Sequence, residues 1–533
     1  MAISRFALLL FWFPISLFSQ DRYFVSFKDK TNTPYSVSSP LQFLSQKSID
    51  RRAKENFTTN SEDLPVDTAY VNQVKMSGAS VFFTSRWFNG VLIQANASTT
   101  SVLSALPFVS KVELVAPGTK LMGGRIKAKD KFERVDATNS LQNQLQLEMI
   151  GLDKMQSTGY HGEGIDVAVF DAGFIGVNTL PSFQAIYQEG RMKSVFNFVN
   201  NSKNVYSAYD HGTEVLSIMA GNVSGSYIGG AYKANFFLYQ TEDVSSEYRV
   251  EEYNWLFAAE RADSAGVDVI NSSLGYNTFD DPSMDYTYKS LDGKTSVVSR
   301  AARKAFERGI VVVNSAGNEG NNSWKYIDVP ADADGVIACG AVNYSGYRST
   351  FSSIGPSADG RIKPDVSGVG EGSIVITSSG NIGPANGTSF SSPLIASLVV
   401  GLRQALPKAS AKEIYQRVIT SASQAAQPDN LLGYGIPNFT LAKDLFDFPD
   451  EFQVFPNPVS DGLLKIIFKD PSDQAFTVII FNLAGQKVFE LSDFINWRNN
   501  PYSLDLSTFA SGLYLTKVQT LTSTKAIRIV KVN

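Results

Sequence analysis

The sequence predicts an α/β domain with a parallel β-sheet, preceded by a small α+β domain and followed by a small all-β sandwich domain. The chain has 533 residues, which is too long for one ordinary domain. Between residues 140 and 446, short β-branched runs alternate with stretches of helical periodicity. After Pro449 the helical periodicity disappears, and short strands alternate with turn residues. We therefore expect a signal peptide at 1–20, an α+β domain at 21–124, a linker at 125–139, the α/β domain at 140–446 and the β-sandwich at 450–533.

Residues 1–20 have the pattern of a secretory signal peptide. Arg5 is a basic start, residues 6–18 are almost entirely apolar, and Ser19 is a small residue suited to cleavage. This apolar run is too short to span a membrane as a helix, which needs about 20 residues. No later stretch is long and apolar enough to span a membrane, so we expect no membrane segment after removal of the signal. An N-terminal membrane anchor is the alternative.

The composition excludes several classes of function. The chain has 47 basic and 51 acidic side chains and a formal charge of −4, which argues against binding to nucleic acid or to anionic membranes. The single cysteine, Cys339, allows no intrachain disulfide and no cysteine-rich metal site. We expect it to be an inert core residue. The two histidines, His161 and His211, are the only candidates for a mechanism that needs an imidazole.

The α+β domain is predicted from mixed periodicity between residues 22 and 116. The strand candidates are 23–27, 80–84, 91–95 and 111–115, and the helix candidates are 40–54, 69–76 and 101–106. The following segment, 125–134, is charged and poor in apolar residues, which predicts an exposed linker and a site of proteolysis.

The α/β domain is predicted from near-continuous apolar strands separated by helices, a pattern typical of a parallel sheet covered on both faces. The strand candidates are 166–170, 236–239, 267–272, 310–314 and 336–342, and the helix candidates are 214–220, 251–265, 295–308, 393–406 and 411–421. The β-sandwich is predicted from short strands between turn sequences such as Pro456-Asn-Pro and Ser460-Asp-Gly.

Four side chains in the α/β domain are candidates for chemistry. Asp171 follows the strand at 166–170, and Asn318 follows the strand at 310–314, where reactive residues of open parallel sheets lie. His211 precedes a helix start, and Ser389 lies ahead of an apolar helix whose N-terminus favours negative charge. Taken singly, each has a structural explanation as a strand-exit turn, a surface histidine, a turn asparagine or a helix cap.

The combination of these four residues is more specific than any one of them. A carboxylate, an imidazole, an amide and a hydroxyl occur in the order Asp171, His211, Asn318 and Ser389. The order Asp-His-Ser differs from the order Ser-Asp-His of α/β-hydrolases, and the chain has no Gly-x-Ser-x-Gly sequence, so a lipase or esterase is disfavoured.

Five ordered motifs of this domain resemble those of the subtilisin-like serine proteases. The aspartate motif is similar to 167–173, the histidine motif to 211–213, the substrate-binding strand to 269–275, the oxyanion segment to 315–318 and the serine motif to 387–393, and 363–366 is a further family landmark. The resemblance implies peptide-bond hydrolysis by Asp171, His211 and Ser389, with Asn318 and the Ser389 backbone N–H as oxyanion hole. It also implies that Ser273, Leu274, Gly275, Ala316 and Gly317 bind the substrate.

Five positions depart from the family pattern. Ala172 stands in place of Ser or Thr, Glu214 and Leu394 stand in place of histidine, and Phe390-Ser391 stands in place of Met-Ala. None is a triad or oxyanion residue, so we interpret them as subfamily variation that alters the shape of the pocket.

Two further polar residues, His161 and Asp328, have no assigned catalytic role. His161 is expected to be a surface turn residue. Asp328, two residues before Pro330, is interpreted as a solvated acid on a loop. The alternative is that it lies near the floor of the primary pocket and favours Lys or Arg. No cofactor is required and no metal ligands are assigned; without EF-hand spacing, calcium is only an expectation from the family.

The flanking domains carry resemblances of their own. Residues 22–116 have the element order of the inhibitory propeptides of these proteases, and a fixed accessory domain is the alternative. The segments 454–459, 480–488, 511–514 and 525–533 resemble the C-terminal sorting domain of the type IX secretion system, and a carbohydrate- or protein-binding module is the alternative. The sorting resemblance implies export through the periplasm and outer membrane of a Gram-negative bacterium, with release or surface attachment.

The sequence thus predicts a secreted serine endopeptidase made as a zymogen. The expected partners are protein or peptide substrates, its own propeptide and the type IX outer-membrane secretion machinery, but not nucleic acid. The competing interpretation is an exported surface protein that uses an inactive protease-like domain for adhesion.

Overall fold

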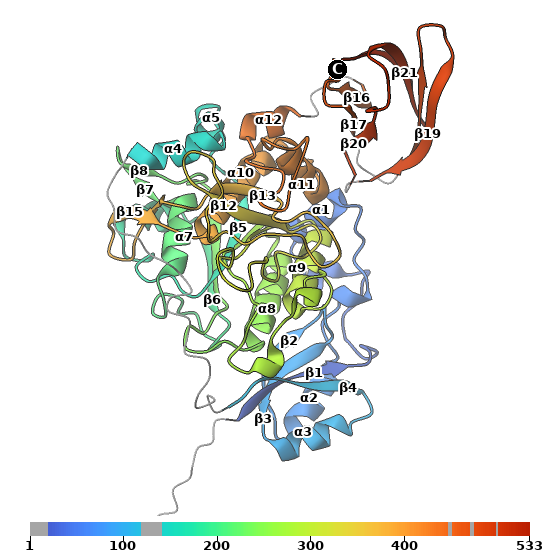
Figure 1. The fold of residues 1–533 in the computed structure, drawn as a ribbon. Coiled ribbons are helices and arrows are strands. Elements are labelled where there is room, and N and C mark those ends of the chain that lie inside the picture. The colour runs from blue at the N-terminus through green and yellow to red at the C-terminus, as the bar shows by residue number, and fades with distance from the viewer. Residues whose placement is uncertain (1–19, 119–140, 446–449, 470–473, 497–498, 533) are drawn as a thin grey trace, which may run out of the picture.

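The computed structural model describes residues 20–118, 141–445, 450–469, 474–496 and 499–532 (Figure 1). The predicted linker at 125–139 and, apart from Gln20, the predicted signal peptide lie outside the described residues. No helix in these ranges is long and apolar enough to cross a membrane. Three units follow one another: residues 20–118, called the N-terminal unit, residues 141–445, called the central domain, and residues 450–532, called the C-terminal unit.

The N-terminal unit is a four-stranded antiparallel sheet in the order β2-β3-β1-β4. Apolar side chains of this sheet pack against α2 and α3, and they form the core of the unit. Its elements are β1 (Asp21–Phe27), α1 (Gln46–Lys54), α2 (Thr68–Met76), β2 (Ser80–Ser85), β3 (Gly90–Ala95), α3 (Ala97–Ser104) and β4 (Val109–Ala116), with 3₁₀ turns at Pro40–Gln42 and Ser61–Asp63.

The predicted helix over residues 40–54 is interrupted. A 3₁₀ turn at Pro40–Gln42 ends before Ser45, whose extended backbone starts α1 and whose side chain accepts a hydrogen bond from Ser48 N. A serine hydroxyl that binds a first-turn N–H is a typical helix N-cap, so the capping side chain sets where α1 begins.

The central domain contains a seven-stranded sheet in the order β13-β12-β11-β10-β5-β9-β6, and all neighbouring strands are parallel. Helices α7 and α10 cover one face and α8 and α9 the other (Figure 1). Alternate residues of β5 enter opposite cores, Val167 and Val169 on the α7 side and Ala168 and Phe170 on the α8 side. The predicted parallel sheet buried on both faces is therefore confirmed.

The elements of the central domain include the main-sheet strands, a set of helices and two small hairpins. They are α4 (Leu141–Met149), α5 (Leu152–Ser157), β5 (Asp166–Asp171), α6 (Gln184–Gln188), β6 (Met192–Asn197), α7 (His211–Ala220), β7 (Asn222–Val223), β8 (Tyr227–Ile228), β9 (Asn235–Gln240), α8 (Val250–Ala265), β10 (Val269–Ser272), α9 (Val297–Glu307), β11 (Val311–Ser315), β12 (Ile337–Val342), β13 (Val366–Val369), β14 (Ser373–Ile376), β15 (Ile382–Ala385), α10 (Thr388–Ala405), α11 (Ala411–Thr420) and α12 (Phe439–Asp444).

The N-terminal unit packs on α8 and α9 of the central domain, as Figure 1 shows. Phe24 of β1 stacks on Tyr253 of α8 with ring centroids 4.4 Å apart, and Phe83 of β2 lies 5.1 Å from Phe257. These contacts belong to one continuous apolar cluster that joins both units. The two units therefore share a hydrophobic core.

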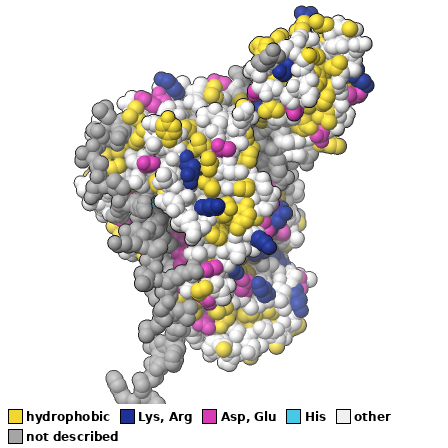
Figure 2. All heavy atoms as spheres, viewed as in Figure 1, with side chains coloured by type: hydrophobic (Ala, Val, Ile, Leu, Met, Phe, Trp, Pro, Cys, Tyr) yellow, Lys and Arg dark blue, Asp and Glu magenta, His cyan; other side chains and the backbone are white. Residues whose placement is uncertain are grey.

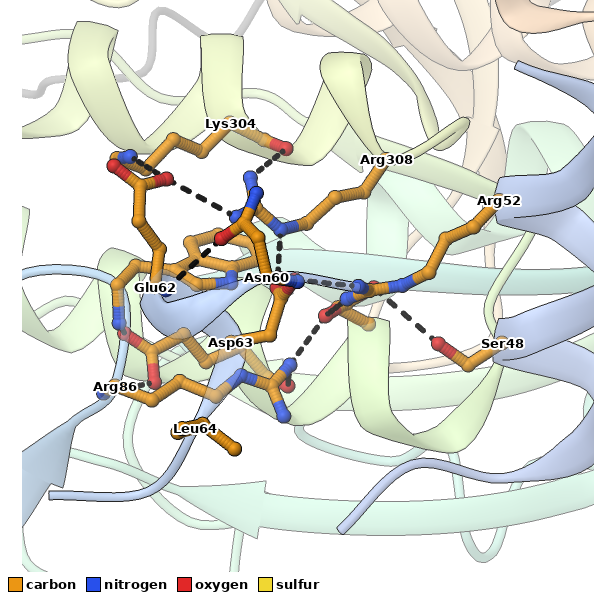
Figure 3. A network of polar contacts seen from close by, with 12 residues as sticks. Ser48, Arg52, Asn60, Glu62, Asp63, Leu64, Arg86, Lys304 and Arg308 are labelled. Atoms are coloured by element: carbon orange, nitrogen blue, oxygen red, sulfur yellow. Dashed lines mark hydrogen bonds and ion pairs between the residues drawn. The ribbon is translucent and has the colours of Figure 1, made fainter. Parts of the chain in front are cut away.

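Buried ion pairs also link the two units, and Figure 3 shows part of this network. Asp263 of α8 pairs with Arg51, Arg52 and Arg86 of the N-terminal unit. Asp63 lies between two guanidinium groups, 3.1 Å from Arg52 and 2.8 Å from Arg308, which directly follows α9. All of these side chains are buried. Together they form the interface ion network.

The C-terminal unit consists of two antiparallel sheets, β16-β17-β20 and β19-β18-β21-β22, around one apolar cluster. The predicted all-β unit is thus confirmed. Figure 2 shows apolar side chains gathered on its surface, and those with large exposure include Leu483, Phe494 and Leu521. The strands are β16 (Phe452–Phe455), β17 (Leu463–Phe468), β18 (Gln474–Phe481), β19 (Lys487–Ile495), β20 (Tyr502–Asp505), β21 (Gly512–Thr520) and β22 (Thr524–Lys531).

Candidate active site

Sheet order brings the predicted site residues to one edge. Strand β10 pairs with β5 on one side and with β11 on the other. Because parallel strands end at the same edge, Asp171 and the segments 273–275 and 316–318 leave the sheet next to one another. His161 precedes the start of β5, so it lies near the opposite edge, where its ring packs against Tyr232.

Asp171 and His211 form a buried pair. The His211 Nδ1 atom lies 2.9 Å from Asp171 Oδ1 and 3.1 Å from Oδ2. Asp171 is 0% exposed and His211 is 1% exposed. Gly212 allows this approach, because a Cβ atom there would lie 2.5 Å from the carbonyl oxygen of Gly173. The carboxylate thus fixes the orientation of the imidazole and selects the tautomer with its proton on Nδ1.

Ser389 is the second residue of α10, and its neighbours tie it to the segment after β10. Pro393 lies inside α10 and has no N–H to donate to the carbonyl of Ser389. The Ser273 hydroxyl donates to that carbonyl instead, at 2.9 Å. The Ser389 Oγ lies 3.5 Å from Ser273 O. The helix N-cap is Gly387, which makes no side-chain capping bond, so Ser389 does not act as the cap.

The amide of Asn318 is oriented by Thr388, the residue before Ser389. Asn318 Oδ1 accepts hydrogen bonds from Thr388 N at 2.9 Å and from Thr388 Oγ1 at 3.0 Å. Because the oxygen is engaged by α10, the Nδ2 group is turned away from Thr388 and keeps its N–H donors for another acceptor. The Thr388 hydroxyl also accepts from Gly317 N at 3.2 Å.

The remaining predicted residues border the same site. The ring of Phe390, next to Ser389, lies 5.8 Å from the His211 ring, so α10 and α7 meet at this edge. Leu274 is buried, and its carbonyl accepts from Asn314 Nδ2 at 2.9 Å. Gly275, Ala316 and Gly317 follow β10 and β11 directly or within three residues.

Two serines of the predicted serine motif, whose contacts the sequence did not predict, attach α10 to the sheet. Ser391 Oγ donates to Gly340 O at 2.7 Å and accepts from Gly368 N at 2.9 Å. Ser392 Oγ donates to Asn271 Oδ1 at 2.8 Å. The run of serines after Ser389 was the available signal, because a polar helix start facing a buried sheet needs such partners.

The burial of one acidic residue and the clustering of three others differ from what the sequence predicts. Asp328 is 5% exposed, so its interpretation as a solvated acid is wrong.

Three glutamates form a cluster that the sequence did not predict. Their carboxylate oxygens lie within 4.8 Å of one another, and the residues are Glu242, Glu247 and Glu251. Tyr276 Oη donates to Glu242 at 2.6 Å. Carboxylates at this spacing are the type of ligand that a hard cation uses.

Comparison with protein families finds three matches along the chain. Residues 162–435 match the Subtilase family, which is just over half of the chain. Residues 22–132 match the peptidase S8 propeptide domain of Bacteroidota, and residues 453–532 match a secretion system C-terminal sorting domain. The three matches follow one another in the order in which the structural units occur.

Individual relatives match the central part of the chain. Subtilisin DY from Bacillus licheniformis is 30% identical over 281 residues, which cover 52% of this chain and 90% of that protein. Subtilisin NAT from Bacillus subtilis subsp. natto is 29% identical over 284 residues, which cover 52% of this chain and 65% of that protein. The solved structure of MycP1 from Mycobacterium smegmatis is 21% identical, with a TM-score of 0.47 over 58% of this chain and 87% of that chain.

Proposed function

The chain belongs to the subtilase family of serine proteases, and from this we propose that it is an exported endopeptidase that uses Ser389, His211 and Asp171. The observation that carries the proposal is the buried Asp171–His211 pair, with Nδ1 to Oδ1 at 2.9 Å, beside the first turn of α10 that holds Ser389. A histidine oriented by a carboxylate next to a serine is the arrangement that activates a hydroxyl as a nucleophile.

The first half of the reaction forms an acyl-enzyme. His211 Nε2 takes the proton of Ser389 Oγ while Oγ bonds to the carbonyl carbon of the substrate, and Asp171 stabilises the resulting imidazolium. Asn318 Nδ2 and the Ser389 backbone N–H donate to the oxyanion, which the N-terminus of α10 also stabilises. The C–N bond then breaks, and the imidazolium gives its proton to the leaving amine.

The second half releases the acid product. A water molecule loses a proton to His211 Nε2 and attacks the acyl carbon, and a second tetrahedral oxyanion forms at the same donors. Its collapse breaks the ester bond and returns the proton to Ser389 Oγ. Each proton is carried by His211, the substrate or water, so none of these steps needs a cofactor.

The flanking domains support a zymogen that is exported. The chain carries a propeptide domain and a C-terminal sorting domain of the type IX secretion system. We expect the propeptide domain to assist folding and to hold the protease inactive until it is cleaved. The sorting domain is expected to direct the chain from the periplasm across the outer membrane, with release or surface attachment.

The test of this function is the Ser389→Ala variant of the mature protein. It should lose labelling by a serine-directed fluorophosphonate and reduce casein hydrolysis by about 10⁶-fold, the loss expected when a triad nucleophile is removed. Ser379→Ala, which alters an exposed serine, is the control and should behave like the wild type. Unchanged casein hydrolysis by Ser389→Ala would refute the assignment.

The inactive adhesion scaffold, the alternative considered from the sequence, is not favoured. The relatives are subtilisins, and the Asp171–His211 pair that an inactive scaffold has no need to keep is intact. Absence of fluorophosphonate labelling in the wild-type mature protein would revive it.

A further inference from the structure

Asp328 is a buried carboxylic acid fastened to both segments that border Ser389. Its backbone N–H donates to Ala316 O at 3.0 Å. The next residue, Val329, exchanges two backbone hydrogen bonds with Tyr276, which follows Gly275. Backbone hydrogen bonds therefore connect the loop that carries Asp328 to the segment 316–318 on one side and to the segment 273–276 on the other.

Two glycines leave room for the Asp328 side chain between these segments. A Cβ atom on Gly275 would lie 2.7 Å from the Cβ of Asp328. A Cβ atom on Gly317 would overlap with Asp328 Oδ2, and the φ of Gly317 is +107°, which disfavours other residues. The carboxylate thus lies against the backbone of both segments, where a side chain on either would displace it.

The same two segments contact the nucleophile. Ser389 Oγ lies 3.5 Å from Ser273 O, two residues before Gly275. Gly317 N donates to the hydroxyl of Thr388, the residue before Ser389. A substrate residue whose carbonyl is attacked by Ser389, with the carbonyl oxygen toward Asn318, therefore has its side chain next to these two segments, between which Asp328 lies.

We propose that Asp328 is a specificity residue that selects Lys or Arg at the position whose carbonyl Ser389 attacks. This inference rests on the proposed peptidase function and adds the class of substrate. A long cationic side chain reaches from the nucleophile toward the place where Asp328 lies between the two segments and pairs there with the carboxylate, whereas an acidic side chain is repelled.

The charge around Asp328 favours a cation. Asn277 Nδ2 donates to Asp328 Oδ1 at 2.6 Å, but no Lys, Arg or His of the described residues forms an ion pair with it. Burial, followed by the negative charges of Glu319 and Glu247, raises the pKa of Asp328 well above its usual value. A buried carboxylate without a cation is costly, so a substrate cation gains binding free energy by pairing with it.

The chain itself contains a segment of matching charge. Residues 125–134, between the N-terminal unit and the central domain, include five basic residues, namely Arg125, Lys127, Lys129, Lys131 and Arg134. A protease that prefers Lys or Arg can cut its own precursor in this segment, which the sequence predicts to be exposed.

The experiment compares peptides that differ only at the attacked position, using the mature enzyme. The residues tested are Arg, its neutral isostere citrulline, Lys, Phe, Ala and Glu. The expected kcat/KM for Arg exceeds that for citrulline by at least about 10-fold, and Asp328→Asn lowers the Arg and Lys values by about 30- to 100-fold, as expected for loss of one partner of a buried pair. The values for Phe and Ala should change by less than about 3-fold.

The controls separate this inference from the proposed function. Asp359→Asn makes the same change in net charge at an exposed position and should leave the profile unchanged. Fluorophosphonate labelling of Asp328→Asn at the wild-type rate shows that Ser389 is intact. If that variant does not fold, inhibition of the wild type by benzamidine, which is planar and cationic, tests the pocket directly, and it should compete with the Arg peptide.

Three outcomes would overturn the proposal or its premise. Cleavage that depends on Ser389 but shows no advantage of Arg over citrulline refutes the role of Asp328 and leaves the peptidase function standing. A preference for Ala with rejection of every larger residue means that Asp328 blocks the space for the substrate side chain instead of recognising a cation. Cleavage of no peptide in a Ser389-dependent manner refutes the proposed function itself.

Discussion

At the scale of single residues, Asn318 is the proposed oxyanion donor whose effect on catalysis can be measured separately. Its Oδ1 is held by Thr388, so the amide group is fixed in orientation before substrate binds. A donor aimed at charge that develops in the transition state contributes to kcat and little to substrate binding.

We predict that Asn318→Ala lowers kcat by about 10²- to 10³-fold with KM nearly unchanged. Steady-state kinetics on a single peptide substrate measure both constants. Asn321→Ala, an exposed position three residues away, is the matched control. A large rise in KM at constant kcat would instead assign Asn318 to ground-state binding.

The sequence predicted which candidate residues come together better than it predicted the contacts that support them. Asp171, His211, Asn318 and Ser389 were predicted from strand ends, helix starts and ordered motifs, and all lie at the carboxyl edge of the sheet or on the helices that meet there. The bond from Ser273 Oγ to Ser389 O could not be predicted, because it depends on a carbonyl that Pro393 leaves unpaired and on the packing of α10 against β10.

Asp328 was misjudged from the sequence for a similar reason. An acid in a loop is usually solvated, and only the three-dimensional arrangement shows that the loop is fastened to the segments after β10 and β11. Burial here is a property of the fold rather than of the local sequence.

At the scale of elements, apolar runs predicted the central strands and failed at less regular ones. Strands β5, β10, β11 and β12 are buried on both faces and were predicted. Strand β6, at the sheet edge, was missed because Met-Lys-Ser-Val-Phe-Asn has no continuous apolar run. Proline is common in the first turn of a helix, so the sequence predicts that helix α10 begins at Pro393. The helix in fact begins at Thr388, and Pro393 lies inside it.

The interface ion network joins α8 to the propeptide domain through Asp263. We predict that Asp263→Asn destabilises the precursor by about 3–5 kcal/mol, because the charges of Arg51, Arg52 and Arg86 remain buried without their carboxylate. Thermal unfolding of the uncleaved chain measures this, with Ser389→Ala in both proteins to prevent self-cleavage. The control variant, Glu113→Gln, breaks the exposed pair with Lys111 and should lower the free energy of unfolding by less than about 1 kcal/mol. An equal loss of unfolding free energy in both variants would contradict the special role of Asp263.

The pH dependence of this contribution follows from the charge on Asp263. Burial raises its pKa, but Arg86, Arg52 and Arg51 together outweigh burial and lower it from 3.8 to about 2. Because the folded pKa lies below the unfolded one, the stabilisation is complete above about pH 4 and is lost as pH falls toward 2. The difference in melting temperature between wild type and Asp263→Asn should therefore be constant from pH 5 to 8 and shrink below pH 4.

At the scale of the whole molecule, the site and the sorting domain are built from separate parts of the chain. Every residue assigned to catalysis or to substrate binding lies between residues 171 and 389, whereas the sorting match covers 453–532. The C-terminal unit has its own core, formed by residues of its two sheets. The order of domains was predictable from changes in composition along the sequence, but the shared core of the first two units was not, since its residues are scattered along both.

We predict that deletion of residues 450–533 abolishes export across the outer membrane and leaves the kcat of the matured enzyme unchanged. Activity is measured in the culture medium and in the periplasm of a native-type host. The full-length Ser389→Ala chain is the control, because it should be exported and inactive. Secretion of the truncated chain at the wild-type level would contradict the sorting role.

The burial of Cys339 has a consequence for where such an enzyme can work. This cysteine, the only one in the chain, is 0% exposed in β12, and burial raises the pKa of its thiol well above the usual value. The nucleophilic thiolate form is therefore suppressed. In the folded protein the Cys339 sulfur is therefore shielded from oxidants, metals and foreign thiols, so an oxidising environment does not inactivate the protein through this cysteine.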